Sequence, residues 1–247
     1  MVALCWWEKE DKTMSMPVDL VLVRHEFSEA NWVQRQMKEE PSYVEPEGFF
    51  DRHDSEMRLH VTGAERAHIT GDWLKQEFPE GFDRHYVSPH VRTIETAGRL
   101  AIGGKWFIDD RWRERDWGEY GILNDEERER RYELAHKLRK QNKWYWCPPG
   151  GESLATGVRL RVEDILDSLH RGYEDKDEST VIGVAHGETN DVFKFVLERL
   201  TPVEWLDQDE DEAFKVSNCQ VIHWSRRDPK TGTIAPKIQW RRSVNAW

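Results

Sequence analysis

Four short stretches of the sequence carry residue types that could transfer a phosphoryl group. They contain Arg24 with His25, Arg92, Glu114, and His186. Each stretch follows a short apolar run, so these polar groups stand at expected strand-to-loop transitions. A deprotonated histidine nitrogen is a nucleophile, and an arginine holds phosphate oxygens with a planar, permanently charged fork. Two histidines, two arginines and a carboxylic acid therefore indicate phosphoryl transfer through a covalent phosphohistidine.

Strands must bring these groups to one place. Residues 18–23 form a nearly continuous apolar run, which is typical of a strand covered on both faces. Further strands are expected at residues 85–87, 106–108, 180–185, 219–224 and 238–240. Because open α/β sheets bind ligands at the carboxyl ends of their strands, we expect the polar groups to converge there.

Helices alternate with these strands, which predicts a three-layer α/β/α sandwich with a mostly parallel central sheet. Thr62 and Glu65 match a capping box at a helix start. Ser88, followed by proline, is expected to cap a second helix whose first turn carries Arg92. A charge-rich run predicts one half-exposed helix over residues 124–143.

Two segments interrupt the alternation inside one expected domain, residues 17–247. Residues 32–57 are polar and rich in turn formers, which predicts an irregular insertion. It follows His25 closely, so it is either a lid over the site or a plain surface loop. A second insertion is expected at about 119–149, and residues 1–16 lack periodicity, as an N-terminal tail does.

The order of these motifs resembles the histidine phosphatase superfamily, the phosphoglycerate-mutase-like proteins, over about residues 18–225. The shared features are the Arg-His opening, Ser-Pro-x-x-Arg, Arg-Glu ahead of an aromatic-Gly pair, and the late His-Gly. The resemblance implies a phosphoglycerate-mutase-like fold and a phosphohistidine intermediate. We expect no cofactor and no metal, because the ten histidines show no metal-ligand spacing.

The resemblance also assigns roles to the basic residues. His25 is the expected nucleophile, and His186 is expected to contact the phosphoryl oxygens. Arg24 and Arg92 are the expected phosphate ligands. Gly187 is expected to let the backbone approach the phosphoryl group closely.

Two carboxyl groups are candidates for the proton donor. Glu114 matches the family position, and Asp116 is the alternative. Ser28 and Asn31 lie at the family's spacing after Arg-His and are expected to bind the phosphoryl group. Glu26 departs from the family, which commonly has glycine here, and we expect its carboxylate to point outwards because it would repel phosphate.

The reaction expected from this resemblance is hydrolysis of a phosphomonoester, either a small phosphorylated substrate or a phosphoprotein. Residues 149–153, Pro-Gly-Gly-Glu-Ser, resemble the phosphatase branch. A cofactor-dependent phosphoglycerate mutase is the first alternative, since Tyr120, Gly121, Leu123 and Asn124 echo the mutases weakly. A non-catalytic phospholigand-binding domain of the same fold is the second.

The composition of the chain disfavours some classes of binding partner. With 36 basic and 47 acidic side chains, the formal net charge of −11 disfavours nucleic acid. No apolar run approaches the roughly 20 residues that span a bilayer, so no membrane partner is expected. The three cysteines form no disulfide framework, which favours the reducing cytoplasm. The sequence leaves the oligomeric state open.

Overall fold

The computed structural model describes residues 16–40, 42–121, 123, 125–172 and 179–247; the expected tail lies almost wholly outside them. Their strands form one six-stranded sheet in the order β3-β2-β4-β1-β5-β6. The strands are β1 (Asp19–Arg24), β2 (Arg84–Val87), β3 (Trp106–Ile108), β4 (Thr180–Ala185), β5 (Val221–Ser225) and β6 (Trp240–Val244). The first four run parallel, and β5 and β6 join antiparallel. The expected mostly parallel sheet is confirmed.

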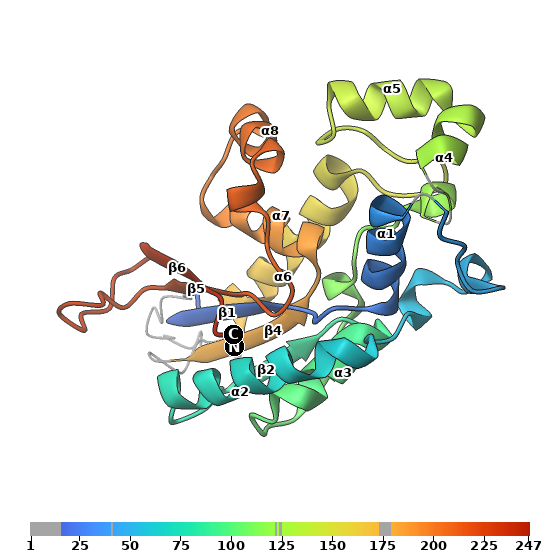
Figure 1. Cartoon of the computed structure of the whole chain (residues 1–247). Helices are drawn as coiled ribbons and strands as arrows, with labels where there is room; N and C mark the ends of the chain where they lie inside the picture. The colour runs from blue at the N-terminus through green and yellow to red at the C-terminus, as the bar shows by residue number, and fades with distance from the viewer. Residues whose placement is uncertain (1–15, 41, 122, 124, 173–178) are drawn as a thin grey trace, which may run out of the picture.

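Helices cover both faces of the sheet, which gives the expected three layers (Figure 1). On one face lie α2 (Ala64–Glu77) and α3 (Val91–Leu100). The other face carries α6 (Arg159–Arg171) and α7 (Gly187–Leu197). The apolar run of β1 follows from burial on both faces of the sheet, because Leu20 and Leu22 pack in one core and Val21 and Val23 in the other.

The layer of α2 and α3 depends on a close backbone contact. A Cβ added at Gly71 of α2 would lie 1.9 Å from the carbonyl oxygen of Leu100, at the end of α3. Only a glycine fits such an approach, since real Cβ atoms do not come within 3.0 Å of a neighbour. The two helices therefore meet backbone to backbone.

Four more helices lie on the side of α6 and α7 in Figure 1: α1 (Glu29–Glu39), α4 (Asp125–Arg131), α5 (Glu133–Gln141) and α8 (Pro202–Glu210). Helix α1 corrects the prediction of an irregular segment over 32–57, whose first part is helical. Its capping box joins Ser28 to Asn31, and Ala30, Val33 and Met37, at three- and four-residue spacing, pack in one small cluster. The long helix predicted over 124–143 is two helices, because the backbone of Tyr132 leaves the helical region.

Two predicted helix starts are also wrong. Thr62 lies in a short 3₁₀ turn, and its hydroxyl pairs with His60 Nδ1 at 2.8 Å, so Gly63 precedes α2 without a side-chain cap. Helix α3 begins after His90 and not after Ser88. The Ser88 hydroxyl is instead hydrogen bonded to His186, which belongs to another strand end.

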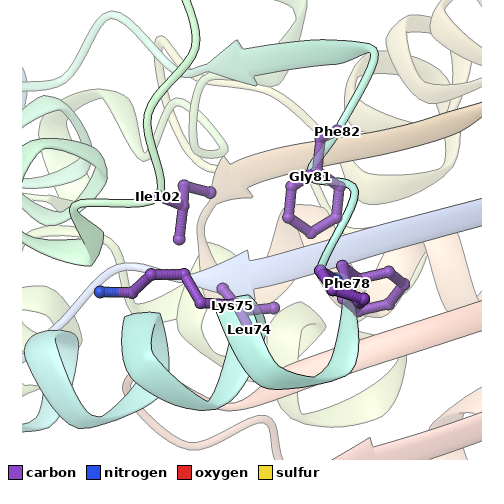
Figure 2. A pocket seen from close by; sticks show the side chains of 7 residues that line it. Leu74, Lys75, Phe78, Gly81, Phe82 and Ile102 are labelled. Carbon is purple, nitrogen blue, oxygen red and sulfur yellow. The ribbon is translucent and has the colours of Figure 1, made fainter.

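Two hollows are notable among the described residues. One of about 120 Å³ lies at the end of α2 and just before β2 (Figure 2), lined by Leu74, Lys75, Phe78, Pro79, Gly81, Phe82 and Ile102. It is remote from the strand ends that carry the polar groups. The other, of about 450 Å³, lies between α1 and residues 43–60, and its aromatic walls are Trp32, Tyr43, Phe49 and His60.

Candidate active site

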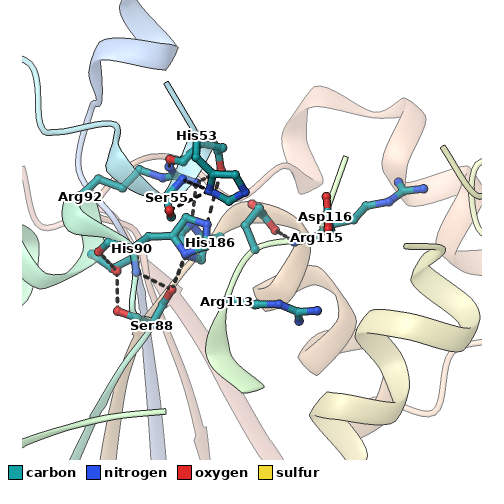
Figure 3. A network of polar contacts seen from close by, with 12 residues as sticks. His53, Ser55, Ser88, His90, Arg92, Arg113, Arg115, Asp116 and His186 are labelled. Carbon is teal, nitrogen blue, oxygen red and sulfur yellow. Dashed lines mark hydrogen bonds and ion pairs between the residues drawn. The ribbon is translucent and has the colours of Figure 1, made fainter. Parts of the chain in front are cut away.

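Three neighbouring parallel strands end beside one another and deliver the polar groups predicted from sequence. Strands β1 and β4 are in register up to Arg24 and Ala185, so His25 and His186 follow them side by side. Their ring centroids are 5.2 Å apart. Strand β2 ends next to β4 and leads into Ser88. Figure 3 shows Ser88, His90, Arg92 and His186 gathered into one network.

His25 is buried and neutral. Its Nδ1 lies 2.7 Å from the carbonyl oxygen of Glu26, and because a carbonyl only accepts, Nδ1 carries the proton. Burial, followed by the charges of Arg92 and Arg24, lowers the pKa of His25 well below its ordinary value. The lone pair on Nε2 is therefore available at neutral pH.

His186 is held between Ser88 and Arg92. Its Nε2 lies 2.7 Å from Ser88 Oγ, and its Nδ1 lies 3.3 Å from Arg92 Nη2. A guanidinium only donates, so Nδ1 accepts here and Nε2 donates to the hydroxyl. Burial and the charge of Arg92 lower the pKa of His186 well below its ordinary value, which leaves the ring neutral.

The network continues through two residues that sequence reasoning missed. Ser88 Oγ lies 3.3 Å from His90 Nδ1, and His90 Nε2 lies 3.4 Å from Asp54 Oδ2. The guanidinium of Arg92 grips the same carboxylate, with Nη2 2.8 Å from Oδ2 and Nη1 3.2 Å from Oδ1. Burial alone would raise the pKa of Asp54, but the His90 hydrogen bond and the Arg92 charge hold it below its usual range.

A sequence signal existed for only one of these two residues. His90 stands two positions before Arg92 at the start of α3, a polar residue at the same strand end. Asp54 lies 38 residues from Arg92 in a polar segment without periodicity, so nothing local distinguishes it from neighbouring acids.

Arg24 is half-buried, and its charge acts on both histidines. Its Nη1 donates to the carbonyl oxygen of Val216 at 2.5 Å. Gly187, the first residue of α7, lies over this guanidinium, but a Cβ there would be 3.5 Å from it, an ordinary contact. A larger residue at position 187 would therefore fit beside Arg24, so this contact does not require a glycine.

Ser28 and Asn31 are engaged in capping α1. Ser28 Oγ accepts from the Asn31 N–H, and Asn31 Oδ1 accepts from the Ser28 N–H, both at 3.2 Å. Asn218 donates to Asn31 Oδ1 at 3.3 Å and to the carbonyl oxygen of His25 at 2.9 Å. Ser28 and Asn31 thus hold the loop after His25. The side-chain N–H groups of Asn31 are the donors that this pair could offer to an anion.

Glu114 lies inside the charged cluster, whereas Asp116 is exposed and accepts from the Gly118 N–H at 2.8 Å. Burial, and then the negative charge of Glu188, raise the pKa of Glu114 to about 7. A carboxyl group with this pKa can hold a proton at neutral pH and release it. Of the two acids proposed from sequence, the structure places only Glu114 near Arg24 and Arg92.

The segment 149–153 holds the two residues that flank Glu114. Glu152 accepts from Arg113 at 2.5 Å and from Arg161 at 2.8 Å. Arg115 turns the same way, and its Nε donates to the Glu152 carbonyl at 2.7 Å. The Glu114 carboxylate between these two arginines lies near Arg24 and Arg92, and its Oε1 accepts from the Arg115 N–H at 3.0 Å and from the Thr189 hydroxyl at 3.4 Å.

Glu26 does not point outwards as expected. It is fully buried, its Oε1 accepts from the Phe27 N–H at 2.7 Å, and its carboxylate lies beside the Cys219 thiol. Burial, together with the Glu26 carboxylate, raises the pKa of Cys219 above its ordinary value. The acid is enclosed beneath the loop, in contact with groups that are not part of the histidine network.

The fold and this site define a class of protein, and comparison with known proteins identifies it. The family model of the histidine phosphatase superfamily (branch 1) matches residues 20–232, so the chain belongs to that superfamily. No curated protein matches the chain significantly.

Solved structures with the same fold include two phosphatases. A mycobacterial glucosyl-3-phosphoglycerate phosphatase in complex with inorganic phosphate superposes with a TM-score of 0.66 at 18% identity, covering 93% of this chain and 99% of that one. The alpha-ribazole phosphatase of Shigella flexneri gives 0.65 at 15% identity, covering 90% and 96%. At these identities the likeness shows the shared fold.

Two further observations concern the described residues alone. None of their helices has the length and apolar character needed to cross a bilayer. Their histidines, cysteines and acids also form no group of three or more that could hold a metal ion.

Proposed function

We propose that this protein is a phosphatase that hydrolyses phosphate monoesters through a phosphohistidine on His25. The observation that carries the proposal is the state of His25, a buried neutral imidazole whose Nδ1 proton is fixed on a backbone carbonyl. Its Nε2 lone pair stands among two arginines and a carboxyl group with a raised pKa. That combination supplies a nucleophile, charge stabilisation and a proton.

In the first step, His25 Nε2 attacks phosphorus while the bond to the ester oxygen breaks. Arg24 and Arg92 stabilise the negative charge on the equatorial oxygens. Glu114 gives its proton to the leaving oxygen. In the second step the Glu114 carboxylate takes a proton from water, and the water oxygen attacks phosphorus while the bond from phosphorus to His25 Nε2 breaks. Inorganic phosphate then leaves, and the electron pair returns to Nε2.

His186 supports both steps by donating to a phosphoryl oxygen. Its Nδ1 now accepts from Arg92, so a proton must reach that nitrogen when a phosphoryl oxygen takes the place of the guanidinium. Ser88 makes the change possible, because a hydroxyl can accept from His186 Nε2 or donate to it.

A small organic phosphate is the proposed substrate in preference to a phosphoprotein. The aromatic-walled hollow of about 450 Å³ has the size of a small-molecule site and adjoins the loop after His25, since the His60 N–H donates to the Phe27 carbonyl at 2.9 Å. The two related phosphatases are named for small organic phosphates. The unpaired Cys147 and Cys219 fit our proposal of a cytoplasmic location.

The test is to trap the intermediate. Rapid quenching without acid, using a ³²P-labelled aryl phosphate, should leave an acid-labile label on His25. His25→Ala should lose at least about 10³-fold in turnover, because the covalent step has no other nucleophile. The matched control is His68→Ala on the exposed side of α2, which should turn over normally.

Two outcomes would contradict the proposal. A label on His186, or normal turnover by His25→Ala, would reassign the nucleophile. Incubation with 3-phosphoglycerate and a bisphosphoglycerate primer, followed by ³¹P NMR, addresses the mutase alternative: 2-phosphoglycerate forming faster than free phosphate would identify a mutase.

A further inference from the structure

The carboxylate of Asp54 occupies the place where a phosphoryl group would be expected to bind. Arg92 holds it through both terminal nitrogens, and Arg92 Nη1 also donates to the Asp54 carbonyl at 2.6 Å. A guanidinium binds phosphate with the same two-pronged geometry that it uses for a carboxylate. The fork of Arg92 therefore cannot hold Asp54 and a substrate phosphate in this way at once.

His90 and His186 lie around the same carboxylate position. His90 Nε2 is 3.4 Å from Asp54 Oδ2, and since a carboxylate only accepts, this nitrogen carries a proton. The His90 and His186 rings are in edge contact, with centroids 4.6 Å apart. A phosphoryl oxygen that replaced Oδ2 would meet donors from both Arg92 and His90.

Arg92 and Asp54 differ in exposure, as expected if Asp54 can leave Arg92 and be replaced by phosphate. The Arg92 side chain is 5% exposed, whereas that of Asp54 is 50% exposed. Asp54 begins a three-residue 3₁₀ turn, Asp54–Glu56. Phe49 and Met57, on either side of the turn, are buried against Val33, so release of the Asp54 carboxylate would leave these two packing contacts in place.

We propose that Asp54 is an internal ligand of the phosphoryl site, held by Arg92 and His90 in the free protein and displaced by the phosphoryl group of the substrate. This inference rests on the proposed function, since it takes Arg92 to be a phosphate ligand. It also assigns His90 as a further phosphate-binding residue. The apparent affinity for phosphate is then the intrinsic affinity multiplied by the fraction of molecules whose site is free of Asp54.

The test measures the dissociation constant of inorganic phosphate by calorimetry for the wild type, Asp54→Asn and Asp54→Ala. Removing the carboxylate should tighten phosphate binding by about tenfold, the gain expected if about one molecule in ten has a free site. Michaelis constants for an aryl phosphate should fall in parallel. Glu56→Ala is the matched control, because it removes one negative charge from the same exposed turn, and it should bind phosphate like the wild type.

The opposite results separate this inference from the proposed function. If Asp54 instead orients Arg92 permanently, both Asp54 variants should bind phosphate more weakly and turn over more slowly, and the inference is wrong while the phosphatase stands. Equal tightening in Glu56→Ala would reduce the effect to net charge and likewise overturn it. If neither the wild type nor Asp54→Ala binds phosphate or cleaves any ester, both proposals fall.

Discussion

Glu114, the proposed proton donor, shows how burial and a neighbouring charge raise the pKa of one carboxyl group. Its carboxyl group is buried, and the Glu188 carboxylate acts on it from the first turn of α7. Both effects disfavour a second negative charge and therefore raise the pKa of Glu114. Glu188 itself lies 3.6 Å from Arg115 and 3.5 Å from Lys143, which keeps its own charge compensated.

This arrangement predicts a pH profile. A general acid works only while protonated, so kcat/KM for an ester with a poor leaving group should fall as pH rises through the pKa of Glu114, near 7. Glu188→Gln removes the negative charge that, besides burial, raises the pKa of Glu114, so the falling limb should move to lower pH. If the pKa falls by about one unit, activity at pH 8 should drop nearly tenfold, whereas activity at pH 5 should hardly change.

The control for this profile is Glu133→Gln, which removes a charge from an exposed, salt-bridged position on α5. Its limb should stay in place. A limb unchanged in Glu188→Gln would show that another group provides the proton. Pre-steady-state rates with an activated aryl phosphate, which leaves unprotonated, should show no such limb.

At the residue scale, the sequence reveals groups that follow a strand and hides groups that reach the site from afar. His25, Arg92, Glu114 and His186 could be predicted because an apolar run precedes each of them. Asp54 could not, since its contact with Arg92 depends on the path of a segment without periodicity.

Elements show the same division between local and distant causes. The central strands were predictable because burial on both faces requires an apolar run, and the amphipathic helices because burial of one face imposes a period on the sequence. Helix starts failed where a side chain had a second partner: the Ser88 hydroxyl is used by His186, and the Thr62 hydroxyl by His60. Helix α1 was missed although Ala30, Val33 and Met37 have helical spacing, because the prolines and glycine beyond the helix led to a prediction of one irregular segment over 32–57.

The contact of α2 with α3 yields a stability prediction. Gly71→Ala places a methyl group against the Leu100 carbonyl, so it should lower the free energy of unfolding by at least about 2 kcal/mol through overpacking. Gly98→Ala is a matched control in the last turn of α3, where the added methyl group meets nothing. It should stabilise the protein by about 0.5–1 kcal/mol through helix propensity.

Urea denaturation of both variants would measure these changes. Equal and small effects would mean that the two helices are not in backbone contact. A loss in Gly98→Ala as large as that in Gly71→Ala would point to a general intolerance of α3.

For the whole molecule, the parallel core explains why its architecture was readable in advance. Strands buried on both faces have to be apolar where they are buried, as residues 20–23 of β1 and 181–185 of β4 are at the centre of the sheet. The edge strand β6 carries less information, because it is mostly exposed, and its predicted position, 238–240, overlaps only the first residue of the strand. The other edge strand, β3, has its predicted bounds, 106–108.

The buried thiol of Cys219 can report transient local opening of the sheet, because it reacts only when it becomes accessible. Alkylating reagents need an accessible thiolate, and Cys219 is fully buried with a raised pKa, whereas Cys147 is exposed. In a Cys5→Ser variant, we expect iodoacetamide to alkylate Cys147 quickly and Cys219 slowly, as measured by mass spectrometry. Cys219 should react only when the sheet opens locally, where β1 ends and β5 begins. Its slow rate, followed through increasing urea, should rise with the unfolded fraction. Equal rates at both cysteines in buffer would mean that this end of the sheet opens freely in the native protein.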